Sequence, residues 1–366
     1  MGKHYVVVST YPETGSKNVG DQLITDSLIG ALRQEKGTDI EFSIVWREAL
    51  WDDVSAAFEK ADFVFFACLA IRPRMHEREY PYLEKVLDSG VPYAVVSAGT
   101  DLDVTGEAVD IFDGFSSESL LLLRRMDREA VFFTTRGYVT QSFCRRAGLE
   151  NALFSGDIAF FNPPFYHHEF AALKDIRRIL ISDPHKPKLY MESLRSLLLE
   201  IRRVFPVAEI VLVQHGVSKA VEIFAQEYGV KLFKAYEDKH GGLNVYAGAD
   251  MHVGFRVHAH VSALSRRVYS YLVEQDGRGC DYGLTIERKI SVPGYSSVCY
   301  GVDFKVGALG KRYRFFKRKA VSKLAPSLLV SMIENDRDHG FLKFAGLEVQ
   351  LRGFVDSLMC FFKKVP

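Results

Sequence analysis

The sequence predicts an α/β protein built from two doubly wound domains that face each other across a cleft. Short apolar runs alternate with helical patterns along most of the chain, and this alternation is typical of parallel sheets covered by helices. It is interrupted once, by the proline- and aromatic-rich stretch FFNPPFYHHEF at residues 160–170, and then resumes. The chain has 366 residues, which is long enough for two domains that each bury a core.

The first alternating run covers residues 5–147. Its apolar runs contain no charged residue, so we expect parallel strands that are buried on both faces. Helices are expected where apolar residues recur every three or four positions. The expected strands are 5–9, 42–46, 63–69, 93–98 and 131–134, and the expected helices are 22–34, 52–60, 82–88, 117–126 and 138–147.

Asn18, Gly20 and Asp21 precede the first expected helix. Asn18 and Asp21 are placed to cap that helix, and Gly20 would let the backbone turn or approach a ligand closely. A plain helix cap and a contact with a substrate therefore both remain open for these residues.

The second alternating run follows the interruption and ends near residue 273. Its expected strands are 178–182, 210–214, 231–234, 251–255 and 268–273, and its expected helices are 189–203, 219–228 and 257–267. The pattern from Lys311 onward is mostly helical. We therefore expect an N-terminal domain at 1–165, a second domain at 175–310, and a basic, helical C-terminal segment at 311–366.

Arg256 and His258 follow the expected strand 251–255 directly, at the start of a helix. That edge of a parallel sheet is where ligands bind, and a helix start offers free N–H groups and a positive dipole end. The pair therefore indicates a site for an anion such as a phosphate or carboxylate. The alternative is an ion pair of Arg256 with a nearby acid and a buried core histidine. Arg136 occupies the same kind of strand-to-helix junction in the first run.

The overall composition excludes several classes of protein. A net charge of +1 gives no general attraction to nucleic acid or to a membrane surface. The start shows no signal-peptide pattern, and no window approaches the roughly eighteen apolar residues that span a bilayer. Five scattered cysteines without a C-x-x-C pair favour reduced thiols. We expect a cytoplasmic protein, either free or at the inner face of the membrane.

No cofactor or metal site is predicted. The histidines are not spaced as a ligand set with a shared carboxylate, and the chain has no Walker loop. It also lacks a G-x-G-x-x-G after its first strand, which argues against a dinucleotide.

The run KRYRFFKRKAVSKL, which begins at Lys311, combines seven basic residues with three aromatic ones and no acid. Such a run is usually a solvated helix face whose side chains extend over apolar surface. The alternative is a peripheral contact of Lys311 to Lys323 with an anionic membrane or a lipid-linked substrate.

Three motifs in this order resemble the polysaccharide pyruvyl transferase family over about residues 5–290. They are Asn18-Val19-Gly20-Asp21; Thr135-Arg136 followed by Ser142, Gly148 and Asp157; and Gly254-Phe255-Arg256-Val257-His258-Ala259. The resemblance implies two Rossmann-like domains similar to those of GT-B glycosyltransferases. It also implies transfer of a pyruvyl group from phosphoenolpyruvate to hydroxyls of a sugar or lipid-linked glycan, which forms a pyruvate ketal.

This resemblance suggests roles for three cationic or titratable side chains. Arg256 would hold the carboxylate or phosphate of phosphoenolpyruvate in a forked contact. His258 would bind the phosphate or give a proton to the enol methylene. Arg136, from the first domain, would complete the anion site when the cleft closes.

The remaining candidates lie around these three. Asp157 would act as base for the sugar hydroxyl or simply hold Arg136, while Asn18, Gly20 and Asp21 would contact the substrate. Where the family has a lysine after the strand that follows the R-x-H helix, the nearest cation here is Arg278.

The chain departs from the family pattern in two places. The third strand ends in Cys68 to Pro73 in place of a glycine-rich loop, and Arg266-Arg267 replaces a small residue and proline. Two other functions therefore stay open: a GT-B glycosyltransferase that uses a nucleotide sugar, and a non-catalytic partner in glycan assembly.

Overall fold

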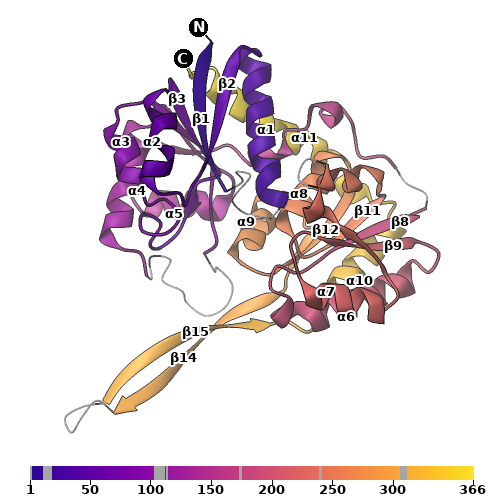
Figure 1. Ribbon diagram of the computed structural model, residues 1–366. Coiled ribbons are helices and arrows are strands. Elements are labelled where there is room, and N and C mark those ends of the chain that lie inside the picture. The colour runs from indigo at the N-terminus through magenta and orange to yellow at the C-terminus, as the bar shows by residue number, and fades with distance from the viewer. Residues whose placement is uncertain are drawn as a thin grey trace.

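The protein is described by a computed structural model that covers residues 2–10, 19–102, 112, 114–172, 175–238, 241–305 and 311–366. Two parallel sheets, each covered by helices, form its two halves (Figure 1). The prediction of two doubly wound α/β units is confirmed. No helix within these ranges is long and apolar enough to cross a membrane.

The first sheet has seven strands in the order β2-β1-β3-β5-β6-β7, with β4 beside β5. Every pair is parallel. Residues of β1, β3 and β5 are buried almost throughout, as expected for strands with helices on both faces. The strands are β1 (Lys3–Ser9), β2 (Ile40–Trp46), β3 (Phe63–Ala67), β4 (Ala70–Ile71), β5 (Tyr93–Thr100), β6 (Phe133–Thr135) and β7 (Ala152–Phe154), and the helices are α1 (Val19–Lys36), α2 (Trp51–Glu59), α3 (Leu83–Asp88), α4 (Ser117–Glu129) and α5 (Tyr138–Arg146).

The second sheet has six strands in the order β10-β9-β8-β11-β12-β13. In chain order this is 3-2-1-4-5-6, the Rossmann arrangement, whose direction of winding reverses between β8 and β11. The strands are β8 (Arg178–Ser182), β9 (Glu209–Gln214), β10 (Lys231–Lys234), β11 (Met251–Gly254), β12 (Tyr269–Glu274) and β13 (Ser291–Pro293), and the helices are α6 (Pro187–Val204), α7 (Lys219–Glu227), α8 (Val257–Ser265) and α9 (Gly277–Thr285).

The first helix begins earlier than predicted. Because α1 starts at Val19, Gly20 and Asp21 lie in its first turn and do not precede it. Asn18, which we expected to cap this helix, lies outside the described residues.

The basic run that begins at Lys311 is a strand, so the prediction of a helix there was wrong. β15 (Lys311–Val321) pairs with β14 (Tyr295–Lys305) in an antiparallel ribbon that projects from the two halves (Figure 1). The two segments pair residue for residue over their whole length, and strand pairing overrides the solvated-helix interpretation. The predicted helical C-terminal segment is confirmed from Ala325, as α10 (Ala325–Asp338) and α11 (Leu347–Phe362).

The two C-terminal helices pack on different halves. On the second sheet, the Tyr271 hydroxyl donates to Asp336 of α10 (2.8 Å). On the first, the Phe362 ring of α11 meets Phe65 of β3 edge-on, with ring centroids 6.4 Å apart. The Tyr5 hydroxyl donates to the carbonyl of Pro366 (2.8 Å), so the chain ends beside β1 (Figure 1). The core of the first half is therefore completed by the last helix.

A helix of the second half caps a helix of the first. The N-cap residue of α5 is Gly137, which has no side chain that could cap the helix. The Asp281 carboxylate of α9 instead accepts the N–H of Val139 (2.8 Å) and the hydroxyl of Thr140 (2.6 Å). Thr285 accepts the N–H of Tyr138 (2.9 Å). The orphan donors at the start of α5 are thus satisfied across the junction, which fixes the two halves relative to each other.

Candidate active site

A cavity of about 430 Å³ lies between the carboxyl ends of the two sheets. In the second sheet, Ser182 ends β8 and Arg256 follows β11, the two neighbours at which the winding reverses. Doubly wound sheets bind ligands at this point. The lining residues from the first half are Thr10, Asp21, Ile24, Arg47, Ala67, Cys68, Ala70, Arg72, Gly99, Thr100, Asp101 and Arg136, and those from the rest of the chain are His185, Lys186, His258, Asp276, Arg278 and Lys319.

Arg256 does not line this cavity but lines a small adjoining pocket that shares His258 and Arg278 with it, and its forked face is already occupied. Nε and Nη2 donate to the two carboxylate oxygens of buried Asp183, at 2.9 and 2.8 Å. The third nitrogen, Nη1, lies 3.1 Å from Nδ1 of His185. The alternative considered for Arg256, an ion pair with an acid, is therefore present, and Nη1 contacts His185, which lines the cavity.

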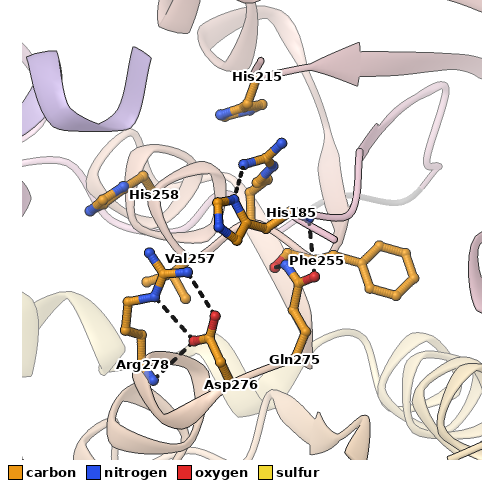
Figure 2. Close-up of a pocket in the computed structure, with 9 residues that line it drawn as sticks. His185, His215, Phe255, Val257, His258, Gln275, Asp276 and Arg278 are labelled. Carbon is orange, nitrogen blue, oxygen red and sulfur yellow. Dashed lines mark hydrogen bonds and ion pairs between the residues drawn. The ribbon is translucent and has the colours of Figure 1, made fainter. Parts of the chain in front are cut away.

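His258 lies in the first turn of α8 with its ring buried (Figure 2). Its Nε2 is buried and has no hydrogen-bond partner among the residues that the structure describes. Burial and the charges of Arg136, Arg278 and Arg256 lower the pKa of His258 to about 3. The imidazole is therefore neutral at pH 7.

Gly20 explains how the two halves approach each other at this ring. A Cβ at position 20 would overlap the His258 imidazole. The glycine of α1 is therefore needed for close packing against α8. The backbone at Gly20 makes its close approach to the His258 side chain of the protein itself.

Arg136 follows β6 and reaches the cavity from the first half. It is buried, its Nε has no partner within the described part of the chain, and its guanidinium lies 5.7 Å from the Tyr282 ring centroid. Gly99 of β5 leaves room for it, because a Cβ there would overlap the guanidinium. Buried donors without partners are rare, so this group is a candidate for binding an anion.

Arg278, the cation considered in place of the family's lysine, also lines the cavity. Its Nη2 contacts Asp276 at 2.7 Å, and Asp276 caps α9 by accepting the N–H of Arg278 (Figure 2). Burial alone would raise the pKa of Asp276, but the Arg278 guanidinium lowers it below its usual value. Partial desolvation and the charges of Arg256 and Arg278 lower the pKa of His185 to about 4.

Several lining side chains were not predicted from the sequence, and three of them are basic residues from outside the first half. His185 and Lys186 follow the carboxyl end of β8, where their position alone signals a site. Lys319 belongs to the basic run and lies where β15 leaves the two halves, with Nζ 4.3 Å from the Tyr295 ring centroid. Its place in the cavity could not be predicted while that run was interpreted as a helix.

The predicted carboxylates divide between the cavity and the core. Asp21 is among the lining residues. Asp157 is fully buried and is not among the described residues that line the cavity. It accepts the N–H of Ala159 (2.8 Å) and the Tyr282 hydroxyl. Both of these contacts are structural, and neither is made with Arg136, the partner considered for this carboxylate.

Apart from Arg136, the wall from the first half carries balanced charge, with Arg47 and Arg72 beside Asp21 and Asp101. Arg47 contacts Glu48 at 3.0 Å, and Arg72 contacts Glu79 at 3.3 Å with Asp101 at 3.9 Å. The opposite wall carries Lys186, Arg278 and Lys319 against a single lining carboxylate. One side of the cavity thus suits an anion, and the other offers the mixed donors and acceptors that bind hydroxyl groups.

The described residues contain no group of three or more histidine, cysteine, aspartate or glutamate side chains that could hold a metal ion.

The fold is similar to that of several solved structures. A protein described as a UDP-N-acetylglucosamine 2-epimerase, from Listeria monocytogenes, is 12% identical, with a TM-score of 0.59 over 97% of this chain and 94% of that chain. A UDP-forming α,α-trehalose-phosphate synthase from Burkholderia vietnamiensis is 8% identical, with a TM-score of 0.51 over 100% and 99%. Such identities concern the fold alone, and they confirm two Rossmann-like domains of the GT-B kind.

In sequence, no curated protein is significantly similar to the chain. A family model described as polysaccharide pyruvyl transferase matches residues 18–277.

Proposed function

Because that match spans most of its 366 residues, the chain belongs to the polysaccharide pyruvyl transferase family, and we propose that it transfers a pyruvyl group from phosphoenolpyruvate to sugar hydroxyls. The acceptor is a polysaccharide or its lipid-linked precursor, and the product is a pyruvate ketal. One observation carries the proposal: His258 lines the cavity beside cationic side chains of the same wall, and its buried Nε2 has no hydrogen-bond partner within the described residues.

The donor end of the cavity is assigned to phosphoenolpyruvate. This small molecule carries a phosphate and a carboxylate, so it needs several fixed cations around it. Arg136 and Arg278 approach from the two halves, and Lys319 from the ribbon. Arg256 contributes Nη1, while its pairing with Asp183 holds the guanidinium in place.

In the proposed reaction His258 is the acid that begins the chemistry. The negative charge of the bound donor offsets the neighbouring guanidinium groups, raises the pKa of His258 and lets it take up a proton. His258 gives this proton to the methylene carbon, which becomes the methyl group and leaves C2 electron-poor. A first sugar hydroxyl bonds to C2 and releases its proton.

The second half of the reaction releases phosphate. The bond between C2 and the phosphate oxygen breaks, and a second hydroxyl of the same sugar bonds to C2 and closes the ketal. Of the two protons released by the hydroxyls, one returns to the imidazole and the other leaves with inorganic phosphate. Asp21 and Asp101 are the carboxylates on the hydroxyl-binding wall, and we assign the hydroxyl contacts to them because Asp157 is enclosed by the core.

The test is incubation with phosphoenolpyruvate and a panel of α- and β-hexosides, with phosphate release and the mass of each acceptor measured together. We expect phosphate release coupled to the mass of a ketal, and a His258→Asn variant that forms no ketal. Ketal formation by this variant at the parent rate would remove His258 from the mechanism.

Thermal unfolding separates the proposal from a glycosyltransferase of the same fold. Phosphoenolpyruvate should raise the melting temperature of the parent protein, whereas UDP-hexoses should leave it unchanged. Protection by a nucleotide sugar alone would favour glycosyl transfer. Protection by neither, together with no phosphate release, would favour a non-catalytic role in glycan assembly.

A further inference from the structure

Beneath the start of α8 lies a buried chain of serine and histidine side chains. Ser182 Oγ lies 2.9 Å from His252 Nε2, His252 Nδ1 lies 2.7 Å from Ser270 Oγ, and Ser270 Oγ lies 2.7 Å from His260 Nδ1. All four side chains are essentially inaccessible to solvent. They come from β8, β11, β12 and α8, so the chain crosses the second sheet at the point where its winding reverses.

The backbone gives this chain one direction. Ser182 Oγ accepts the N–H groups of Phe255 (3.0 Å) and Arg256 (3.1 Å). A hydroxyl has two acceptor positions and one hydrogen, so the hydrogen of Ser182 remains for Nε2 of His252.

The direction passes on to the second histidine. Because Nε2 of His252 accepts, its hydrogen is on Nδ1 and is donated to Ser270. The Ser270 hydrogen is then donated to Nδ1 of His260, whose own hydrogen is on Nε2. The two imidazoles are therefore neutral and have opposite tautomers. Burial lowers the pKa values of both, which agrees with neutral rings.

The two ends of the chain hold the same helix. One end binds the N–H of Arg256, the residue before α8, and the other binds His260 inside α8. His258 lies between these two points. Gly254 supports the arrangement, because its φ of +156° is open mainly to glycine and a Cβ there would overlap Ser182.

We propose that Ser182, His252, Ser270 and His260 are positioning residues that fix the start of α8, and with it Arg256 and His258, against the sheet. None of the four is among the residues that line the cavity. Their effect on phosphoenolpyruvate rests on the proposed function, whereas the tautomers and the protection of the backbone follow from the geometry alone.

The tautomers are tested in the unaltered full-length protein by nitrogen-15 NMR of the histidine side chains. We expect His252 to carry its hydrogen on Nδ1 and His260 on Nε2 at pH 7. A hydrogen on Nε2 of His252 would give Ser182 Oγ three donors, so that result would overturn the proposal. This measurement needs no variant, so it can overturn the proposal even if a variant fails to fold.

The positioning role is tested with Ser270→Ala, and Ser265→Ala is the matched control. Ser265 is an equally buried serine at the far end of α8, where it accepts from Asn162 and donates to the carbonyl of Ser262. Hydrogen exchange at the amides of Phe255 and Arg256 should be faster in Ser270→Ala than in the parent or the control. Equal exchange rates in both variants would show that the serine and histidine side chains only stabilise the fold. That result would overturn the proposal.

The consequence for the ligand is measured on the same pair of variants with phosphoenolpyruvate. Ser270→Ala should weaken binding by roughly tenfold, because small displacements of a fixed site have large effects, and Ser265→Ala should leave it near the parent value. If exchange rises but binding is equal in the two variants, the positioning role fails. If the parent itself does not bind phosphoenolpyruvate, the proposed function fails. The histidine tautomers and the amide exchange rates then still test whether the serine and histidine side chains fix the start of α8.

Discussion

At the scale of single residues, Gly20 sets how closely α1 approaches His258. We expect Gly20→Ala to weaken phosphoenolpyruvate binding by at least about tenfold, because the added Cβ overlaps the imidazole and displaces it. Overpacking of this kind should also lower the free energy of unfolding by about 1–3 kcal/mol. Isothermal titration and urea unfolding measure the two effects.

Gly353→Ala is the control for this substitution. Gly353 is also a helical glycine, but a Cβ there meets no atom within 4 Å. The control should bind like the parent and be more stable by about 0.5–1 kcal/mol, since alanine loses less backbone freedom on folding. Equal binding by both variants would contradict the packing argument.

His258 should take up a proton when phosphoenolpyruvate binds. Its pKa of about 3 in the empty cavity leaves it neutral, and an anion beside it stabilises the charged form. Titration calorimetry in buffers of different ionisation enthalpy should therefore show uptake that grows from pH 8 to pH 6. The donor phosphate also titrates in this range, so the histidine contribution is the difference between the parent and His258→Asn. A zero difference would rule out the coupling.

The site could be predicted where its residues occupy local junctions. Arg136, Arg256 and His258 each stand between a strand and a helix, so a short stretch of sequence places them at the ligand-binding edge. An ion pair of Arg256 with an acid was one of the two interpretations, but Asp183 could not be identified as the partner because it lies 73 positions away. Likewise, the motif indicated Asp157 as a site residue, but Asp157 is buried and its carboxylate accepts the Tyr282 hydroxyl.

At the scale of elements, the ribbon contributes a charge to the cavity through the end of β15. Lys319→Gln should weaken phosphoenolpyruvate binding by about fivefold at low salt, and the difference should shrink as the salt concentration rises. Lys323→Gln is the control, because Lys323 is an exposed lysine that is not among the lining residues. Equal losses in the two variants would indicate a general effect of charge and not a contact in the cavity.

Most strands of both sheets were predicted from their apolar runs, whereas the short strands β4, β7 and β13 and the ribbon were not. Read alone, the basic run is typical of a solvated helix. Its strand form depends on pairing with Tyr295–Lys305, and such pairing is set by contacts between segments and not by either segment's own pattern. The same limit applies to α5, whose cap comes from Asp281 in the other half.

At the scale of the whole molecule, four buried histidines should make the protein sensitive to acid. Burial lowers the pKa values of His215 and His252 below their usual value and those of His258 and His260 to about 3. The unfolded chain binds protons below about pH 6.5, while the folded protein stays neutral at these positions. The stabilisation is therefore complete above pH 6.5 and is lost as the pH falls toward 3.

Urea unfolding at pH 7 and pH 5.5 measures this effect. We expect the free energy of unfolding to fall by about 1 kcal/mol for each buried histidine. His260→Gln should make this fall in the free energy of unfolding smaller by about 1 kcal/mol. A free energy of unfolding that is constant or higher at pH 5.5 would contradict the assignment of neutral buried rings.

The return of α11 to the first sheet also constrains the order in which the protein can fold during synthesis. A nascent chain that has reached β13 already holds both sheets, but Phe65 and Phe132 still lack Phe362 and Phe361, the rings that cover them. The Tyr5 hydroxyl likewise lacks its acceptor, the carbonyl of Pro366, until that residue has been made. The first half is therefore completed only after the second half has been made, because its apolar surface at Phe65 and Phe132 stays uncovered until α11 can pack on it.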